Sequence, residues 1–226
     1  MSEATVRART DAFRAAAARV LEPARIRRPD ASCTIDGLVP QVAVEPADAD
    51  QVARILAEAR GNKLAVVPVG GASHLSIGNV PAAYDVALAL HRLDAVIAHE
   101  PGDMTVTVQP GVRLADLQAR LAEHHQTLPL DPPASAATIG GVIAANAYGP
   151  LRHAHGTVRD WLIGMTVALP DGTLAKSGGR VVKNVTGYDM HKLHVGSFGT
   201  LGVIVEATFK LAPLPVRRET VAAMFN

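Results

Sequence analysis

Apolar residues recur with two different periods in the first half of the chain, and these periods predict alternating strands and a helix. Short apolar runs at 42–46 and 64–69 each predict a buried strand. Between them, Asp48 and Gln51 have the spacing of a helix capping box, and Gly61 is expected to end the helix. The apolar positions at helical spacing are Val52, Ile55, Leu56 and Ala59. The pattern therefore predicts a β-α-β unit that runs directly into two glycines.

Beyond about residue 84 the pattern changes to paired strands, with a helix among them. The expected strands are 86–90, 104–108, 161–169 and 203–211, with a helix from 114 to about 124 and a hairpin turn at 170–173. A further helix is expected over 10–22. We therefore expect an α+β fold with a small lobe at 34–82 and a larger lobe at 83–213. An N-terminal helix and linker (1–33) would precede the lobes, and a tail (216–226) would follow.

Composition narrows the classes of function. The 226 residues carry a net charge of +1 without a basic stripe, so nucleic acid is a poor candidate partner. Cys33 is the single cysteine, which excludes a disulfide framework or a cysteine-based metal site within this chain. We see no apolar run long enough for a transmembrane segment and no secretory signal, and we expect a cytoplasmic protein.

Four glycine-rich segments are the candidate ligand-binding features. Glycine allows backbone amides to converge on an anion such as a diphosphate, although each segment alone is more readily explained as a tight turn or as close packing of a strand on a helix. The segments are 70–74, 138–141, Gly149 with Gly156, and 196–202. Neither G-x-G-x-x-G nor GxxxxGK[ST] is present, so a nucleotide would be held by a different architecture. TIGGVIAANAYGP (138–150) avoids bulky side chains, which suggests that something approaches its backbone closely.

Several motifs in order resemble one flavoprotein family. They are PVGGASHLSIG (68–78), TIGGVIAANAYGP (138–150), HGTVRD (155–160), GRVVKNVTGYDMHKL (179–193) and VGSFGTLGVIVEATFKLAPLP (195–215). They are similar to the FAD-binding domain of the vanillyl-alcohol-oxidase / PCMH-type flavoproteins, and most similar to the E subunit of bacterial glycolate oxidase. The resemblance covers about 34–215.

The resemblance implies a two-lobed PCMH-type fold, with a small βαβ lobe and a larger mixed or antiparallel sheet with flanking helices. FAD would lie between the lobes, with its pyrophosphate on the amides of 70–74 and on the Ser73 hydroxyl. The implied cofactor-binding residues are Pro68, Gly70, Gly71, Ala72, Ser73, His74, Pro132, Thr138, Gly140, Gly141, Ala144, Gly149, Gly156, Val158, Gly202 and Ile204. Relatives with covalent FAD carry a histidine at the position of Ala72. Here the histidine is His74, so we expect noncovalent FAD. Ala72 also replaces a glycine that is common in this loop.

The family further implies an FAD-binding subunit of a 2-hydroxy-acid oxidase or dehydrogenase, acting in electron transfer. Its partners would be a catalytic flavoprotein subunit and an iron–sulfur subunit, with membrane association only through them. We expect the cap domain that supplies substrate groups in relatives to be absent, and we assign no catalytic residues. The alternatives are a free-standing FAD-dependent oxidoreductase, a structural subunit that has lost FAD, and a cell-wall-precursor reductase.

The remaining polar residues are expected to be structural, with two exceptions. Histidine pairs at 124/125, 153/155 and 191/194 have spacings seen at metal sites, but we expect no metal. His155 could approach a flavin. We expect Asp189 to cap a short helix, Lys192 to be solvated and Trp161 to pack in the core. Lys183-Asn184 could be a phosphate contact, a subunit-docking surface or neither.

Overall fold

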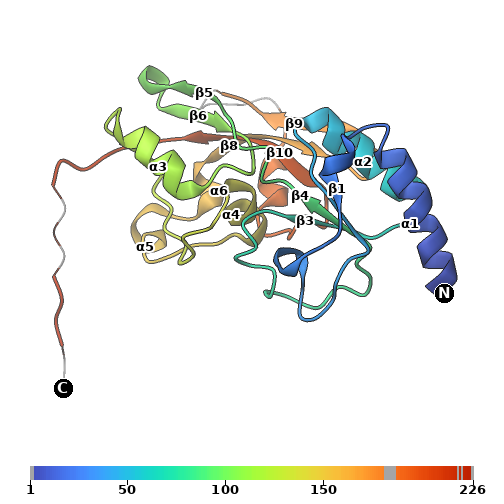
Figure 1. Cartoon of the computed structure of the whole chain (residues 1–226). Helices are drawn as coiled ribbons and strands as arrows, with labels where there is room; N and C mark the ends of the chain where they lie inside the picture. The colour runs from blue at the N-terminus through green and yellow to red at the C-terminus, as the bar shows by residue number, and fades with distance from the viewer. Residues whose placement is uncertain (1–2, 181–186, 218, 220, 225–226) are drawn as a thin grey trace.

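The computed structural model describes residues 3–180, 187–217, 219 and 221–224, and its two main sheets form two lobes (Figure 1). The first sheet has the order β1-β2-β4-β3, in which β1 is antiparallel to β2 and the other pairs are parallel. Its strands are β1 (Ile26–Arg27), β2 (Val42–Val44), β3 (Val66–Val69) and β4 (Val86–Ala89), and its helices are α1 (Glu3–Ala17) and α2 (Ala49–Gly61).

Local signals fix α2 as the sequence predicts. The Asp48 carboxylate accepts a hydrogen bond from the Gln51 amide at 2.7 Å, and the Gln51 side chain accepts one from the Ala47 amide at 2.8 Å. These bonds satisfy amides that a helix start leaves without intrahelical partners. The face of α2 that carries Ile55 and Ala59 is buried completely.

The N-terminal region is part of the small lobe, which corrects two sequence predictions. The helix expected over 10–22 is α1, Glu3–Ala17, and it packs on α2 with Phe13 fully buried. The segment predicted as linker contains β1, which pairs with β2. An edge strand of two residues has no periodicity that a sequence pattern could reveal.

The boundary between the lobes lies later than the predicted position at 82/83. β4 pairs in parallel with both β2 and β3, so it is a central strand of the first sheet rather than part of a hairpin in the second. All four residues of β4 are buried. A strand that is covered on both faces carries an apolar run, which does not distinguish parallel from antiparallel pairing.

The second sheet is antiparallel, with the order β5-β6-β10-β8-β9. Its strands are β5 (Val96–Glu100), β6 (Thr105–Val108), β8 (Leu162–Ala168), β9 (Leu174–Gly178) and β10 (Val203–Lys210), and a small separate sheet pairs β7 (Gln126–Thr127) with β11 (Ala212–Pro213). The predicted turn at 170–173 joins β8 to β9, with Gly172 at a φ of 86°. The helices α3 (Leu114–Ala122), α4 (Ile139–Ala145), α5 (Arg152–His155) and α6 (Val158–Trp161) lie together on one side of this sheet (Figure 1).

Four 3-10 turns complete the described secondary structure. They are η1 (Pro23–Arg25), η2 (Ala31–Cys33), η3 (Pro101–Asp103) and η4 (Met190–His194). Among the described residues, no helix combines the length and the apolar character needed to cross a membrane.

The two lobes share a hydrophobic core. Ala168, Val203 and Val205 belong to the second sheet, yet they are buried in the same cluster as Val44 and Ile55 of the first lobe. On the same side, the turn at Gly172 lies so close to α2 that an added Cβ would stand 2.9 Å from the Ala53 carbonyl oxygen. The lobes are therefore packed against each other away from any ligand.

Candidate functional site

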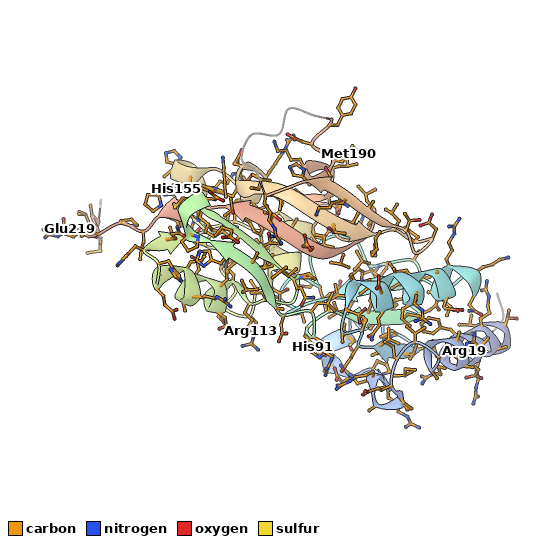
Figure 2. The ribbon with its side chains drawn as sticks, turned by 90° about the horizontal axis from the view of Figure 1, so that it is seen from above. Arg19, His91, Arg113, His155, Met190 and Glu219 are labelled. Carbon is orange, nitrogen blue, oxygen red and sulfur yellow. The ribbon has the colours of Figure 1, made fainter. Side chains whose placement is uncertain are left out.

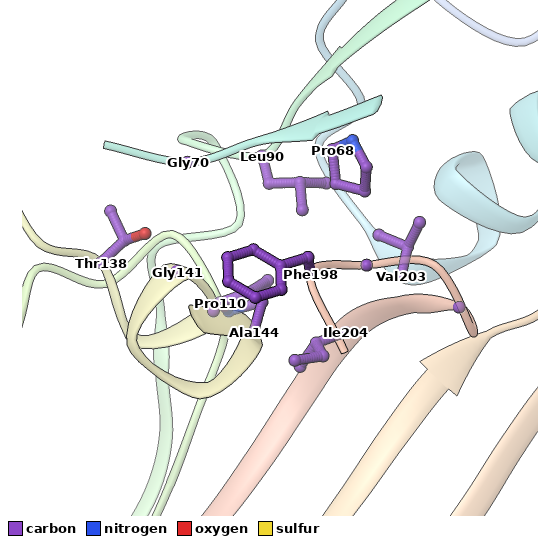
Figure 3. Close-up of a pocket in the computed structure, with 13 residues that line it drawn as sticks. Pro68, Gly70, Leu90, Pro110, Thr138, Gly141, Ala144, Phe198, Val203 and Ile204 are labelled. Atoms are coloured by element: carbon purple, nitrogen blue, oxygen red, sulfur yellow. The ribbon is translucent and has the colours of Figure 1, made fainter. Parts of the chain in front are cut away.

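Two adjoining cavities lie where the end of β3 and the following loop face α4 and residues 198–204 (Figure 3). The smaller cavity has a volume of about 70 Å³ and the larger one about 440 Å³. The lining residues common to both are Pro68, Gly70, Gly141, Ala144, Phe198 and Gly199. Together the cavities form one elongated cleft between the two lobes.

Twelve of the sixteen predicted cofactor-binding residues line this cleft. They are Pro68, Gly70, Gly71, Ala72, Ser73, His74, Thr138, Gly140, Gly141, Ala144, Gly202 and Ile204. The structure thus brings together three segments that lie far apart in the sequence.

The other four, Pro132, Gly149, Gly156 and Val158, do not line the cleft. A Cβ on Gly149 would stand 2.1 Å from the Asp131 carbonyl oxygen. Gly156 has a φ of 81°, and a Cβ there would stand 2.5 Å from Asp160 Oδ2. Val158 is fully buried in the core of the large lobe. Packing within the chain accounts for both glycines and for Val158.

The lack of bulk in TIGGVIAANAYGP has two causes. Its second residue, Ile139, begins α4, a helix that the sequence analysis did not predict. A Cβ on Gly140 would stand 2.7 Å from Pro110 Cβ, so this glycine permits close packing of protein on protein. A Cβ on Gly141 would stand 3.3 Å from Thr138 Oγ1 and, apart from its chain neighbours and the backbone of α4 itself, would have no other atom within 4 Å. Gly141 therefore keeps space open in the cleft.

The glycines of the 70–71 loop serve the contact between the lobes. A Cβ on Gly70 would stand 2.4 Å from Thr138 Oγ1, and one on Gly71 would stand 1.9 Å from the Ala136 carbonyl oxygen. Ala72, the next residue, has a φ of 56°, a left-handed conformation that favours glycine. This strain explains why a glycine at this position is common in the family that the motifs resemble.

The cleft offers neutral hydrogen-bond donors and few charges. Within the described parts of the chain, the amides of 71–74 donate no hydrogen bond to another protein group. Ser73 Oγ lies 2.8 Å from His74 Nδ1, and Thr138 Oγ1 is buried without a described partner. His74 is the only ionisable side chain among the lining residues. A diphosphate in this cleft would therefore be met by amide and hydroxyl dipoles rather than by Lys or Arg.

Part of the lining of the larger cavity is apolar. The apolar lining residues include Ile35, Val67, Leu75, Ile77 and Val80, which suit a flat aromatic ring. A cleft with unpaired amides, an unpartnered buried hydroxyl and these apolar lining residues fits a dinucleotide such as FAD.

Sequence reasoning missed several lining residues, of which Phe198 is the most prominent. Its amide donates to the Ala144 carbonyl at 2.9 Å, and its φ is 52°. Figure 3 shows its ring between α4 and the residues of the small lobe. Leu90, Pro110 and Gly199 were also missed. Phe198 and Gly199 lie inside the motif at 195–215, so their place in this motif could have identified them as lining residues.

The remaining polar residues have structural surroundings. His153 and His155 are exposed, whereas His191 and His194 are buried. No group of three or more potential metal ligands occurs in the described ranges. The Trp161 indole packs beside the core of the large lobe and donates to the His155 carbonyl at 3.0 Å.

Asp189 does not cap η4 through its side chain, which corrects that prediction. Its carboxylate instead pairs with Lys192 at 2.6 Å, because the two side chains are three residues apart on the surface. Lys183 and Asn184 lie outside the described residues.

Comparison with curated proteins finds relatives that are named as oxidases or dehydrogenases of hydroxy acids. The chain is 33% identical to glycolate oxidase subunit GlcD of Bacillus subtilis over 189 residues, which is 83% of this chain and 40% of the relative. It is 36% identical to the mitochondrial D-lactate dehydrogenase [cytochrome] of Arabidopsis thaliana over 188 residues, which is 83% of this chain and 33% of the relative. It is 34% identical to glycolate oxidase subunit GlcE of Escherichia coli over 160 residues, which is 70% of this chain and 45% of the relative. The chain thus spans less than half the length of these relatives.

A solved structure of alkyldihydroxyacetonephosphate synthase has the same fold. It superposes with a TM-score of 0.77 at 21% identity over 91% of this chain and 41% of that chain. The likeness confirms the two-lobed α+β architecture. The family model described as "FAD binding domain" matches residues 40–178, more than half of the chain. With this match, and with the cleft formed by its motifs, the chain belongs to the family of FAD-binding domains.

Proposed function

We propose that the chain holds FAD noncovalently in the cleft and forms the flavin-carrying part of a 2-hydroxy-acid oxidase or dehydrogenase. The observation that carries this proposal is the convergence of three motif segments on one elongated cleft. The names of the relatives, which include glycolate oxidase subunits and a D-lactate dehydrogenase, support the class of substrate.

The residues of the cleft would divide the work of binding. The unpaired amides of 71–74 would donate to the pyrophosphate, and Thr138 Oγ1 would donate to an acceptor on the cofactor. Gly141 would leave room for the cofactor beside α4, and the apolar lining residues of the larger cavity would exclude water from an aromatic ring. Bound FAD would supply a ring system that accepts a hydride and passes electrons onward. Protein dipoles around the ring would tune its electronics.

We further propose that the chain works as one subunit of a complex. Two of the relatives are named as subunits of glycolate oxidase. A catalytic flavoprotein subunit and an iron–sulfur subunit would then be the partners, and the 2-hydroxy acid would be oxidised by the complex. There are two alternatives. The chain is a free-standing oxidoreductase, or it is a subunit that has lost FAD.

The visible absorption spectrum of the purified chain tests the first proposal. We expect a flavin spectrum, with all of the flavin released into the supernatant by acid precipitation. Flavin that stays with the precipitate would contradict noncovalent binding. A colourless protein that does not take up added FAD would contradict the proposal and favour a subunit that has lost FAD.

Anaerobic addition of glycolate or D-lactate to the flavin-loaded chain distinguishes a subunit of a complex from a free-standing oxidoreductase. We expect no bleaching by the chain alone, because the groups that bind substrate would come from elsewhere in the complex. Rapid bleaching would instead identify a free-standing oxidoreductase.

A further inference from the structure

A second concave site lies on the small lobe, away from the FAD cleft. It is a groove of about 510 Å³ between α1 and the segments that flank β1 and precede β2. Its lining residues, the arginine groove, are Val6, Arg7, Thr10, Asp11, Arg14, Arg28 and Gln41. Figure 2 shows Arg19, two residues after the end of α1, at the opposite end of the molecule from His155 of α5. None of the lining residues is shared with the cleft.

Three guanidinium groups surround the groove. Arg7 and Arg14 are seven residues apart in α1, which places them on one face and about 10 Å apart along the helix axis. Arg28 lies across the groove, just after β1. The first 30 residues hold seven of the 22 basic residues of the chain, all of them arginines, so the groove lies in an arginine-rich region.

The charges of the groove are poorly compensated within the protein. Arg14 donates to the Gln41 carbonyl at 2.7 Å, and neither Arg7 nor Arg28 makes an ion pair with a described residue. The neighbouring Arg27, by contrast, pairs with both Asp30 and Glu45. Unpaired guanidinium groups on a concave surface favour a ligand that brings its own carboxylates or phosphates.

The surroundings indicate the class of that ligand. The apolar face of α1, with Phe13 and Ala17, is buried on the small lobe, so α1 cannot insert into a lipid surface. No aromatic side chain lines the groove for base stacking. Asp11 lies between Arg7 and Arg14 on the helix and repels a uniformly charged phosphate chain. A peptide can place a neutral residue opposite Asp11 and acidic residues on either side.

We propose that the arginine groove docks an acidic segment of a partner protein, with carboxylates on Arg7, Arg14 and Arg28. Docking there leaves the FAD cleft accessible and does not depend on bound flavin. The groove thus supplies an attachment point that is separate from the redox site.

Fluorescence anisotropy with a labelled peptide of alternating Glu and Gly tests the proposal, with the corresponding Gln–Gly peptide as a probe without charge. We expect the full chain to bind the Glu peptide and not the Gln peptide. The double variant Arg7→Glu/Arg28→Glu should weaken binding roughly tenfold or more, because it reverses two charges at the site. Asp11→Asn should tighten binding, because it removes a like charge.

The matched control is Arg92→Glu/Arg120→Glu, which reverses two exposed charges outside the groove. We expect this variant to bind the Glu peptide with nearly unchanged affinity. The proposal would be overturned if the control variant lost as much affinity for the Glu peptide as the groove variant, or if Asp11→Asn gained none. It would also be overturned if inorganic triphosphate or phosphatidylcholine–phosphatidylglycerol vesicles bound more tightly than the Glu peptide and this binding depended on the groove arginines. Circular dichroism and flavin content verify folding, and Arg7→Gln/Arg28→Gln replaces the double variant if it does not fold.

Discussion

At the scale of single residues, the glycines of the cleft lack a side chain for different reasons. Gly70, Gly71 and Gly140 allow one part of the chain to contact another, and a Cβ on any of them would stand less than 3 Å from a protein atom. Gly141 faces open space apart from the Thr138 hydroxyl. Substitutions in the first group should therefore affect folding, whereas substitution of Gly141 should affect the ligand.

We expect Gly141→Val to abolish retention of flavin while the protein stays folded, because the branched side chain would occupy the cleft. Flavin content after purification and circular dichroism measure the two effects. Gly61→Val, at an open position at the end of α2, is the control and should keep its flavin. A folded Gly141→Val variant with full flavin content would remove Gly141 from the binding site.

Gly71→Ala should instead destabilise the whole protein. The added methyl group would lie on the Ala136 carbonyl oxygen, and backbone atoms on both sides would have to move. We expect the free energy of unfolding to fall by roughly 2–4 kcal/mol. Chemical denaturation measures the loss. An unfolding midpoint equal to that of the wild type would show that the two segments do not touch in solution.

Ala72→Gly should stabilise the protein slightly. A left-handed alanine costs roughly 1–2 kcal/mol, and a glycine costs roughly 0.4–1 kcal/mol of extra entropy in the unfolded chain. We therefore expect the free energy of unfolding to rise by up to about 1.5 kcal/mol. The same change at Ala57, inside α2, should lower it by about 1 kcal/mol. A loss of stability at Ala72 would contradict the φ of 56° at this residue.

At the scale of elements, one buried carboxylate connects β1 to its surroundings. Glu45 is 8% exposed and accepts from Arg27, with Arg25 at 3.6 Å and His91 at 3.7 Å. β1 has only two residues in the sheet, so these charges stabilise its place beside β2. The ion pairs are partly screened, since both arginines reach solvent.

Glu45→Gln should lower the free energy of unfolding by roughly 2–4 kcal/mol, because it leaves the arginines without their buried counter-charge. Equilibrium denaturation in urea provides the measurement. Asp189→Asn breaks an exposed pair with Lys192 and should cost less than about 1 kcal/mol. Equal losses in the two variants would contradict a special role for Glu45.

The elements that the sequence predicts well are those with local signals. The capping box of α2 and the turn before β9 each lie within a few residues. β1 and the parallel pairing of β4 depend on partners about twenty residues away or more, which no local pattern encodes. α4 was missed as a helix because two glycines in its first turn lower helix propensity, and tertiary packing overrides that preference.

At the scale of the whole molecule, two buried histidines couple stability to pH. Burial lowers the pKa of His194, whose Nδ1 has no partner in the described residues. Burial also lowers the pKa of His191, and nearby Asp189 partly opposes the shift. Both rings are therefore neutral in the folded protein at a pH where the unfolded chain begins to take up protons.

Stability should accordingly be constant well above the ordinary histidine pKa of 6.5 and fall as the pH drops below it. Thermal melting from neutral to mildly acidic pH measures this dependence, at about 2–4 °C for each kcal/mol lost. His194→Leu should flatten the slope, and His153→Leu at an exposed position should not. Carboxylates with a lowered pKa, such as Asp160, lose their contribution to stability only at a more acidic pH than the histidines do. An unchanged slope in His194→Leu would contradict this assignment.

The sequence predicted those residues of the candidate site that belong to the motifs and line the cleft. Twelve residues named from the resemblance line it, but Gly149, Gly156 and Val158 belong to packing within the large lobe. A motif does not distinguish a glycine that faces a ligand from one that faces a carbonyl of the same chain. Phe198 was missed because its position over the cleft depends on its hydrogen bond to α4.

The buried cluster that unites Ala168, Val203 and Val205 with the small lobe determines how a cofactor can leave. Since separating the lobes would expose this cluster to water, hinge opening is far more costly than rearranging the exposed loop that begins at Ala72. Exchange of flavin should thus follow local fluctuations of that loop, at a rate that is insensitive to mild denaturant. If the chain were cut between the lobes, each fragment would expose its share of this common hydrophobic core. The fragments should therefore fold only when they are mixed and bind each other.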